Sequence, residues 1–137
     1  MRKSDFETLA QARLDDARML FEHQRYSSAY YLAGYSIEFA LKACIALQFR
    51  QHDIPDKRFV IATYTHNLTD LVKQADLQQK LGRRKDDGST FAANWATVSE
   101  WDEQSRYQVW TAVDAEYLLS AIDDPQDGVL PWIRTFW

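Results

Sequence analysis

The sequence predicts an all-α fold, an antiparallel up-and-down bundle of four to five helices with a short C-terminal helix. Long segments repeat apolar residues at the three- and four-residue spacing of one helical face, and one segment is apolar nearly all round. Stretches that alternate apolar and polar residues, as strands do, are almost absent. Since 46% of the 137 residues are hydrophobic, the chain can fill one core, and we expect a single domain over residues 1–137.

The first and the last long helix each begin at a recognisable capping pattern. Residues 5–23 carry a regular apolar face, and Ser4 with Glu7 matches the S-x-x-E capping box at its start. Thr111 and Asp114 repeat this pattern before a second apolar-periodic stretch. We therefore expect one helix at each of these places.

The second helix is expected to be the centre of the bundle. It follows Ser27 and Ser28, which can cap it, and extends to about Arg50. Because it is apolar on nearly every side, other helices should surround it. Gly34, inside this helix, would let a neighbouring backbone come close.

The middle of the chain has weaker patterns. Residues 51–65 are expected to form a connection, in which the apolar residues 59–61 could be extended. Thr65 or Asn67 can then cap a helix with Leu68, Leu71, Val72 and Ala75 on one face, and Leu77 with Leu81 can continue it or begin another.

The segments on either side of the last long helix differ in composition. Residues 82–90 are charged and lack apolar side chains, which predicts a mobile loop. Residues 91–110 are too aromatic for a linker and should pack on the bundle. Gly128 is expected near the end of the last long helix, and residues 129–137 should form the short C-terminal helix, with Pro131 at its first helical position, N1.

The charges are distributed unevenly. The formal net charge of −4 excludes a protein that coats nucleic acid through charge alone. Residues 1–85 nevertheless carry 14 Lys and Arg against 10 Asp and Glu, whereas residues 86–137 carry 2 against 10. An anion-binding surface should therefore draw on residues 1–85.

The sequence lacks the motifs that several classes of enzymes and metal sites require. The four glycines are too far apart for a phosphate-binding loop, and the sequence has no G-x-S-x-G motif. Cys44 stands alone in an apolar helix, and His23, His52 and His66 lack partners at metal-ligand spacing. We expect no metal and no cofactor. Without a secretory leader or an apolar membrane span, a cytoplasmic protein with no membrane contact is expected.

A polar stripe interrupts the apolar second helix. Tyr31, Tyr35, Glu38 and Lys42 fall on one side of it, and Glu38 and Lys42 can form an intrahelical ion pair. The stripe is either a structural ion pair or the wall of a ligand cleft. Arg106, one of two basic residues after residue 85, is the expected partner of Glu38.

Two other features have a plain structural reading beside a functional one. The basic run Arg83, Arg84 and Lys85, with Lys80 nearby, can contact phosphates, but Asp86 and Asp87 follow it and favour a solvated loop. The five tryptophans are explained by core packing, and an exposed subset would suit an oligomer interface.

Four sequence pieces resemble one family. The run from Tyr26 to Ala43, with its string A-G-Y-x-x-E-x-x-L-K-A, is similar to the second helix of the HEPN family, the higher eukaryotes and prokaryotes nucleotide-binding domains. His66-Asn67-Leu68-x-x-Leu71 resembles the H-[DN]-L-x-x-L start of the family's next helix. The pieces Trp101-x-x-x-x-Arg106-Tyr107 and Gly128-Val-Leu-Pro-Trp-Ile133 resemble its W…RY element and the ending of some bacterial members.

This resemblance implies a helical bundle, commonly a homodimer, often paired with a small nucleotidyltransferase in toxin-antitoxin-like systems. Many members are metal-independent ribonucleases with an R-x(4–6)-H motif near the start of the last long helix. The sequence departs there, because Thr111, Ala112 and Val113 follow Arg106 at the positions for histidine. Arg18 and His23 fit the bare pattern, but in the first helix, where the family does not place it.

Three functions are compatible with these observations. The favoured one is a non-catalytic module that binds a nucleotide, an RNA segment or a partner protein in a groove between the second helix and the segment before the last. The second is a ribonuclease toxin in which Arg106 binds the scissile phosphate and His66 or His23 is the acid-base. The third is an architectural subunit whose aromatic surfaces hold a dimer or a partner enzyme. The candidate ligand-binding residues are Tyr35, Glu38, Lys42, His66, Arg106 and Tyr107.

Overall fold

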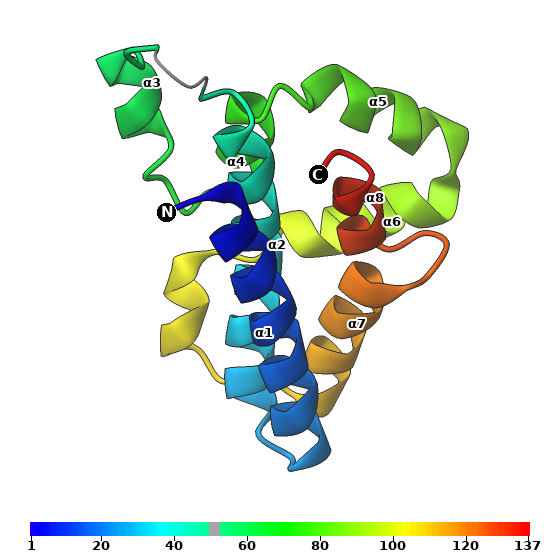
Figure 1. The fold of residues 1–137 in the computed structure, drawn as a ribbon. Coiled ribbons are helices and arrows are strands. Elements are labelled where there is room, and N and C mark those ends of the chain that lie inside the picture. The colour runs from blue at the N-terminus through cyan, green and yellow to red at the C-terminus, as the bar shows by residue number, and fades with distance from the viewer. Residues whose placement is uncertain (50–52) are drawn as a thin grey trace.

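The computed structural model describes residues 1–49 and 53–137, and these form eight α-helices and one 3-10 helix (Figure 1). No β-strand occurs in the described ranges, so the all-α prediction is confirmed. None of these helices combines the length and the hydropathy that a membrane span requires. In chain order the elements are α1 (Lys3–Glu22), α2 (Tyr26–Ala46), α3 (Lys57–Ala62), α4 (Leu68–Gln74), α5 (Gln78–Asp87), α6 (Ser89–Ser99), the 3-10 helix η1 (Glu103–Tyr107), α7 (Ala112–Asp123) and α8 (Val129–Arg134).

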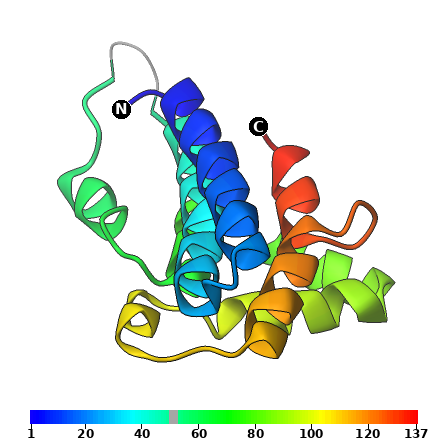
Figure 2. The same ribbon diagram turned by 90° about the horizontal axis from the view of Figure 1, so that it is seen from below.

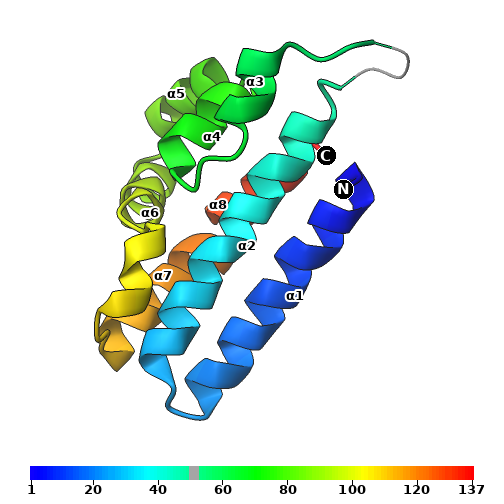
Figure 3. The same ribbon diagram turned by 90° about the vertical axis from the view of Figure 1, so that its left-hand side faces the viewer.

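Helix α2 is the centre of the bundle, as predicted. It runs antiparallel to α1 along nearly the whole length of both helices (Figure 3) and also packs against α4, η1, α7 and α8. Figure 2 shows α7 and α8 beside this pair and α5–α6 crossing below. The side chains of α2 that face these neighbours are buried, among them Ala33, Ile37, Ala40, Leu41 and Ala43. One apolar helix thus carries the core, and its single polar stripe marks the side where a site can form.

The predicted N-caps of α1 and α2 are wrong, whereas those of α4 and α7 are confirmed. The N-terminus of α1 is capped by Asp5, whose Oδ2 accepts the Arg2 backbone N–H at 2.8 Å. Ser27 lies inside α2, where its Oγ accepts the backbone N–H of Trp110 at 2.9 Å. The predicted end of α2 near Arg50 falls outside the described residues, and the described helix ends at Ala46. Asn67 and Thr111 do cap α4 and α7 through their side-chain oxygens.

Two segments predicted as connections are helical. Residues 57–62 form α3, because the Asp56 carboxylate accepts the backbone N–H groups of Arg58 and Phe59; residues 51 and 52 of this connection lie outside the described part. The expected mobile loop over 82–90 is the end of α5 and the start of α6. Arg84 orders it by packing over the Phe91 ring, 4.5 Å from its centroid, and by an ion pair with Asp127 at 3.0 Å.

The C-terminal end differs from its prediction at Gly128. Helix α7 ends at Asp123, and Gly128 lies directly before α8, so that it precedes the short helix. The prediction of Pro131 at the first helical position is wrong, because α8 begins two residues earlier, at Val129. As the third residue of α8, Pro131 still lies in the first turn, where its missing N–H breaks no helical hydrogen bond. Val129, Leu130 and Ile133 of this helix are buried in the core.

The buried phenol of Tyr30 should make the protein sensitive to alkali. Tyr30 is 5% exposed and stacks on Trp110, and burial, followed by the charges of Glu100, Asp114 and Asp102, raises its pKa to about 12. Because the fold favours the neutral phenol, this contribution is complete below the unfolded pKa of about 10 and is lost as the pH rises through about 12. Urea unfolding between these pH values should show a loss of roughly 3 kcal/mol that Tyr30→Phe largely removes.

The control for this prediction is Tyr64→Phe, since Tyr64 is 72% exposed. It should leave the alkaline decline of the wild-type protein unchanged. Cys44, whose pKa burial raises to about 11, contributes in the same direction and is common to all three proteins. Parallel declines of the wild-type protein and Tyr30→Phe would contradict the assignment.

Candidate functional site

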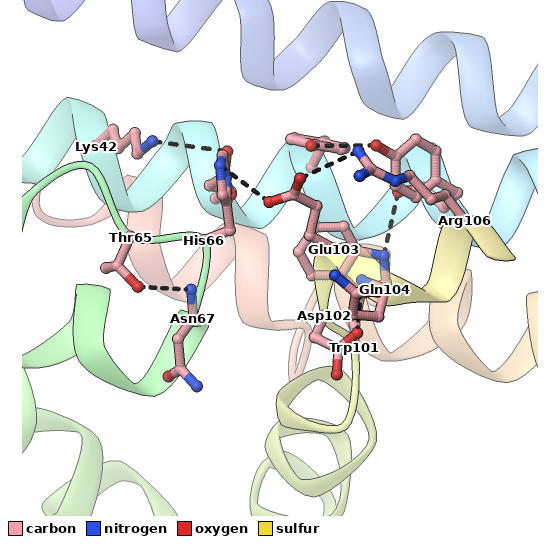
Figure 4. A network of polar contacts seen from close by, with 12 residues as sticks. Lys42, Thr65, His66, Asn67, Trp101, Asp102, Glu103, Gln104 and Arg106 are labelled. Atoms are coloured by element: carbon pink, nitrogen blue, oxygen red, sulfur yellow. Dashed lines mark hydrogen bonds and ion pairs between the residues drawn. The ribbon is translucent and has the colours of Figure 1, made fainter.

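The six candidate residues come from three places in the chain that the fold brings to one side of α2. Tyr35, Glu38 and Lys42 lie on successive turns of α2, His66 lies just before α4, and Arg106 and Tyr107 end η1. Figure 4 shows polar contacts made by Lys42, His66 and Arg106. The name His66 network is used below for Lys42, Glu38, His66, Glu103 and Arg106.

Glu38 holds the imidazole of His66 from behind. The side chain of Glu38 is 2% exposed, and its Oε1 lies 2.7 Å from His66 Nδ1. A buried carboxylate needs a hydrogen-bonded partner, so this contact fixes both the tautomer and the orientation of the ring. Nδ1 donates the hydrogen bond to Glu38, which leaves Nε2 available to a second group, and the His66 side chain is 44% exposed.

Nε2 of His66 meets a second carboxylate. Glu103 Oε2 lies 3.0 Å from it, and Glu103 Oε1 accepts a hydrogen bond from Arg106 Nη1 at 3.1 Å (Figure 4). Both carboxylate contacts of His66 are favourable together only for the imidazolium, since a neutral ring carries one N–H. In a neutral ring that donates from Nδ1 to Glu38, Nε2 would instead be an unprotonated, basic nitrogen.

Arg106 is not the partner of Glu38, which corrects that prediction. It pairs with Glu103 within the same turn of η1, and its guanidinium lies 4.7 Å from the centre of the Tyr107 ring. The hydroxyls of Tyr107 and Tyr31 raise the pKa of Arg106 above its already high ordinary value, so the side chain keeps its charge. Glu38 pairs with Lys42 and His66 because these lie next to it in α2 and in the chain that leads into α4.

Lys42 forms the predicted intrahelical pair, with its Nζ 3.7 Å from Glu38 Oε2. Its side chain is 15% exposed and also borders an apolar pocket of about 300 Å³. This pocket is also lined by Phe6, Phe39 and Tyr64, and His66 is not part of its lining. Helix α2 packs against η1 in the segment before α7, which is where the binding groove was predicted. At this place His66 and Arg106 are half-exposed side chains on the surface.

Aromatic side chains support the network from the α2 side. The Tyr31 hydroxyl donates to the Tyr35 hydroxyl at 3.2 Å, and the Tyr35 ring meets the ring of His66 edge to face, with centroids 6.4 Å apart. Desolvation by burial is the main reason why the pKa of Tyr35 is raised. Tyr35 also packs on Trp101, so it links α2 to the start of η1.

Two buried or half-buried tryptophans fix the backbone of η1. Trp101 is 2% exposed and donates its Nε1–H to the Tyr31 carbonyl at 3.1 Å. Trp110 stacks on Tyr30 with ring centroids 3.8 Å apart, and its Nε1–H binds the Ser105 carbonyl at 3.0 Å. Because η1 is held at both ends, Arg106 and Glu103 are presented from a fixed backbone.

Glu103 is the site residue that the sequence did not reveal. Its spacing of three residues from Arg106 indicates a local ion pair, but nothing in the sequence places it on His66, 37 positions earlier. Tyr107, which was predicted, is 71% exposed and contacts the network through Arg106.

The remaining candidate residues do not form a site together. Arg18 binds Asp123 of α7, and His23 Nδ1 lies 2.8 Å from the Met19 carbonyl at the end of α1, so the R-x-x-x-x-H pattern in the first helix is structural. Within residues 1–49 and 53–137, no three His, Cys, Asp or Glu side chains are grouped as metal ligands; His52 lies outside these ranges.

Comparison with known proteins adds the family. The family model of the HEPN domain matches residues 7–124, which include all six candidate residues. Neither the curated proteins nor the solved structures gave a match to the chain. The central helix with its polar stripe, the helical bundle and this match agree, and the chain therefore belongs to the HEPN domain family of helical nucleotide-binding or ribonuclease-type modules.

Proposed function

We propose that this HEPN domain is a non-catalytic binding module that takes a phosphate group of a nucleotide or an RNA segment between His66 and Arg106. The observation that carries the proposal is the orientation of His66. Buried Glu38 holds Nδ1 at 2.7 Å, which directs Nε2 outward to the carboxylate that Arg106 also binds. His66 and Arg106, which lie on separate elements, thus both bind one oxyanion, the Glu103 carboxylate, and both side chains are half-exposed.

The binding function is favoured over catalysis because the acid-base equipment is incomplete. Cleavage next to a 2′-hydroxyl needs one group to take a proton and another to give one. Among the described residues of the network, His66 supplies an imidazole that can act as an acid-base group. Arg106 cannot act as a base, because its raised pKa keeps it protonated. The positions after Arg106, where the family motif has histidine, supply no second acid-base residue to act with His66.

A metal-independent ribonuclease is the second candidate, and the Glu38–His66 pair favours it specifically. A carboxylate on Nδ1 stabilises the imidazolium that forms when Nε2 accepts a proton. In this function Arg106 would bind the scissile phosphate and His66 would be the acid-base. His23, the other histidine considered for this role, lies at the end of α1 and binds the Met19 carbonyl.

One experiment tests both candidates. A short fluorescein-labelled single-stranded RNA is titrated with purified protein at low ionic strength in excess chelator, anisotropy is measured, and the RNA is then run on a denaturing gel. We expect Arg106→Ala to weaken binding about tenfold or more, since it removes a charge-assisted contact. Arg83→Ala, a matched loss of one exposed arginine on α5, should change binding less than twofold.

The outcomes separate the candidates. Intact RNA with binding that depends on Arg106 supports the binding module, whereas shortened RNA that stays intact with Arg106→Ala supports the ribonuclease. Equal losses for Arg106→Ala and Arg83→Ala would move the anion-binding surface to the basic run on α5. Binding that neither substitution changes would contradict both candidates.

The family also suggests partners. We propose that the chain, as a single domain over residues 1–137, is a homodimer in the cytoplasm and the accessory subunit of a nucleotidyltransferase in a toxin-antitoxin pair. Apolar side chains exposed at the end of η1 and along α7 support an interface there. These are Tyr107, Val109, Val113 and Tyr117, which are 71%, 93%, 54% and 67% exposed.

A further inference from the structure

We propose that Glu103 is a built-in competitor for phosphate, occupying in this structure the subsite on His66 and Arg106 that a phosphate oxyanion of the ligand takes. The inference rests on the proposed function, since the same two side chains serve both. It adds that the subsite is closed by the chain itself and opens when the Glu103 side chain turns aside.

The contacts of Glu103 are those expected of a bound oxyanion. One oxygen faces Nε2 of His66 at 3.0 Å and the other accepts from Nη1 of Arg106 at 3.1 Å. Carboxylate and phosphate both offer pairs of acceptor oxygens to such donors, which is why guanidinium groups bind either. A donor arrangement that fits the Glu103 carboxylate therefore also fits one edge of a phosphate group.

The two carboxylates on His66 differ in their freedom to leave. The side chain of Glu38 is 2% exposed and is also held by Lys42, so it is a fixed part of the protein. The side chain of Glu103 is 26% exposed on the five-residue η1. Because Trp101 and Trp110 anchor the backbone on either side, rotation of the Glu103 side chain is enough to free the donors.

The energetics favour exchange with a phosphate. Ion pairs between partly exposed side chains are individually weak, so breaking the two that hold Glu103 lowers affinity by no more than about tenfold. A terminal phosphate monoester carries more charge than a carboxylate at neutral pH, an RNA phosphodiester carries the same single charge, and either would gain the contacts that Glu103 gives up. Removal of Glu103 also leaves His66, Arg106 and Lys42 facing the single buried charge of Glu38, which favours anions further.

The test is Glu103→Gln, with the labelled RNA as probe and inorganic phosphate as competitor. We expect this variant to bind the RNA about fivefold to tenfold more tightly than the wild-type protein and to be displaced by less phosphate. Glu100→Gln is the matched control, because it removes the same charge three residues away, at the exposed end of α6, and it should change affinity less than twofold.

A second variant keeps the charge. Glu103→Asp shortens the side chain by one methylene, so its carboxylate cannot reach both donors, and it should also bind more tightly, though less so than Glu103→Gln. Equal affinities of the wild-type protein, Glu103→Gln and Glu103→Asp would overturn this inference while leaving the proposed function standing. RNA bound by none of the proteins would overturn both.

Discussion

Replacing Gly34 with alanine is expected to destabilise the protein by about 3 kcal/mol or more. A Cβ built at this position lies 2.1 Å from the Cδ2 and Cε2 atoms of the Trp101 indole, far inside van der Waals contact. Trp101 is buried and hydrogen-bonded to the Tyr31 carbonyl, so the ring cannot move without breaking that contact. Urea unfolding followed by circular dichroism measures the loss.

The matched control is Gly82→Ala on α5. A Cβ there has no neighbour within 4 Å, so the substitution should stabilise the helix by about 0.5 to 1 kcal/mol. Because Trp101 positions η1, Gly34→Ala should also weaken RNA binding under conditions where it is still folded. A free energy of unfolding equal to that of the wild-type protein would mean that Trp101 does not pack on Gly34.

Replacing Glu38 with glutamine is expected to cost about 3 kcal/mol and to abolish binding that depends on His66. The amide keeps the shape of the side chain but removes the charge that compensates Lys42, whose side chain is 15% exposed. The amide also places N–H donors where the carboxylate accepted from Lys42 or His66. The stability loss is therefore that of a broken buried ion pair, and the binding loss follows from a freely turning imidazole.

A double variant separates the charge from the packing. Glu38→Gln combined with Lys42→Met should be less destabilised than the sum of the two single variants, because neither charge is left alone. Glu22→Gln, at an exposed position on α1, should stay within about 0.5 kcal/mol of the wild-type protein. Additive losses in the double variant would contradict a buried pair and would make Glu38 a surface charge.

Local rules explain which parts of the fold were predictable. The apolar character of residues 26–46 placed α2 at the centre, because a helix without a polar face must be covered on all sides. The cap at Thr111 was predictable because the two residues that form it, Thr111 and Asp114, lie three positions apart in the sequence. The helix over 57–62 and the extension of α5 over 82–87 were missed. The first depends on a single carboxylate cap, and the second is held by the ion pair of Arg84 with Asp127, 43 residues away.

The candidate site divides in the same way. Glu38 and Lys42 were found as a pair because one turn of helix separates them. Arg106 was found by its charge in an acidic part of the chain and by the resemblance to the family, and His66 by that resemblance. The predicted partnership of Arg106 with Glu38 was wrong, because charge and spacing in the sequence carry no information about which surfaces meet. Glu103 was missed for that reason too, since its neighbour His66 belongs to a distant segment.

The sequence by itself determined the all-α class, the central helix and the polar stripe on it, because helical periodicity depends on residues three and four apart. Only the tertiary structure decided that His66 is held between Glu38 and Glu103 and that Arg106 shares the second carboxylate. These contacts join α2, the start of α4 and η1, and they exist because Trp101 packs on Gly34 and brings η1 against α2. Such a packing choice depends on the shape of the whole core, which no local pattern in the chain records.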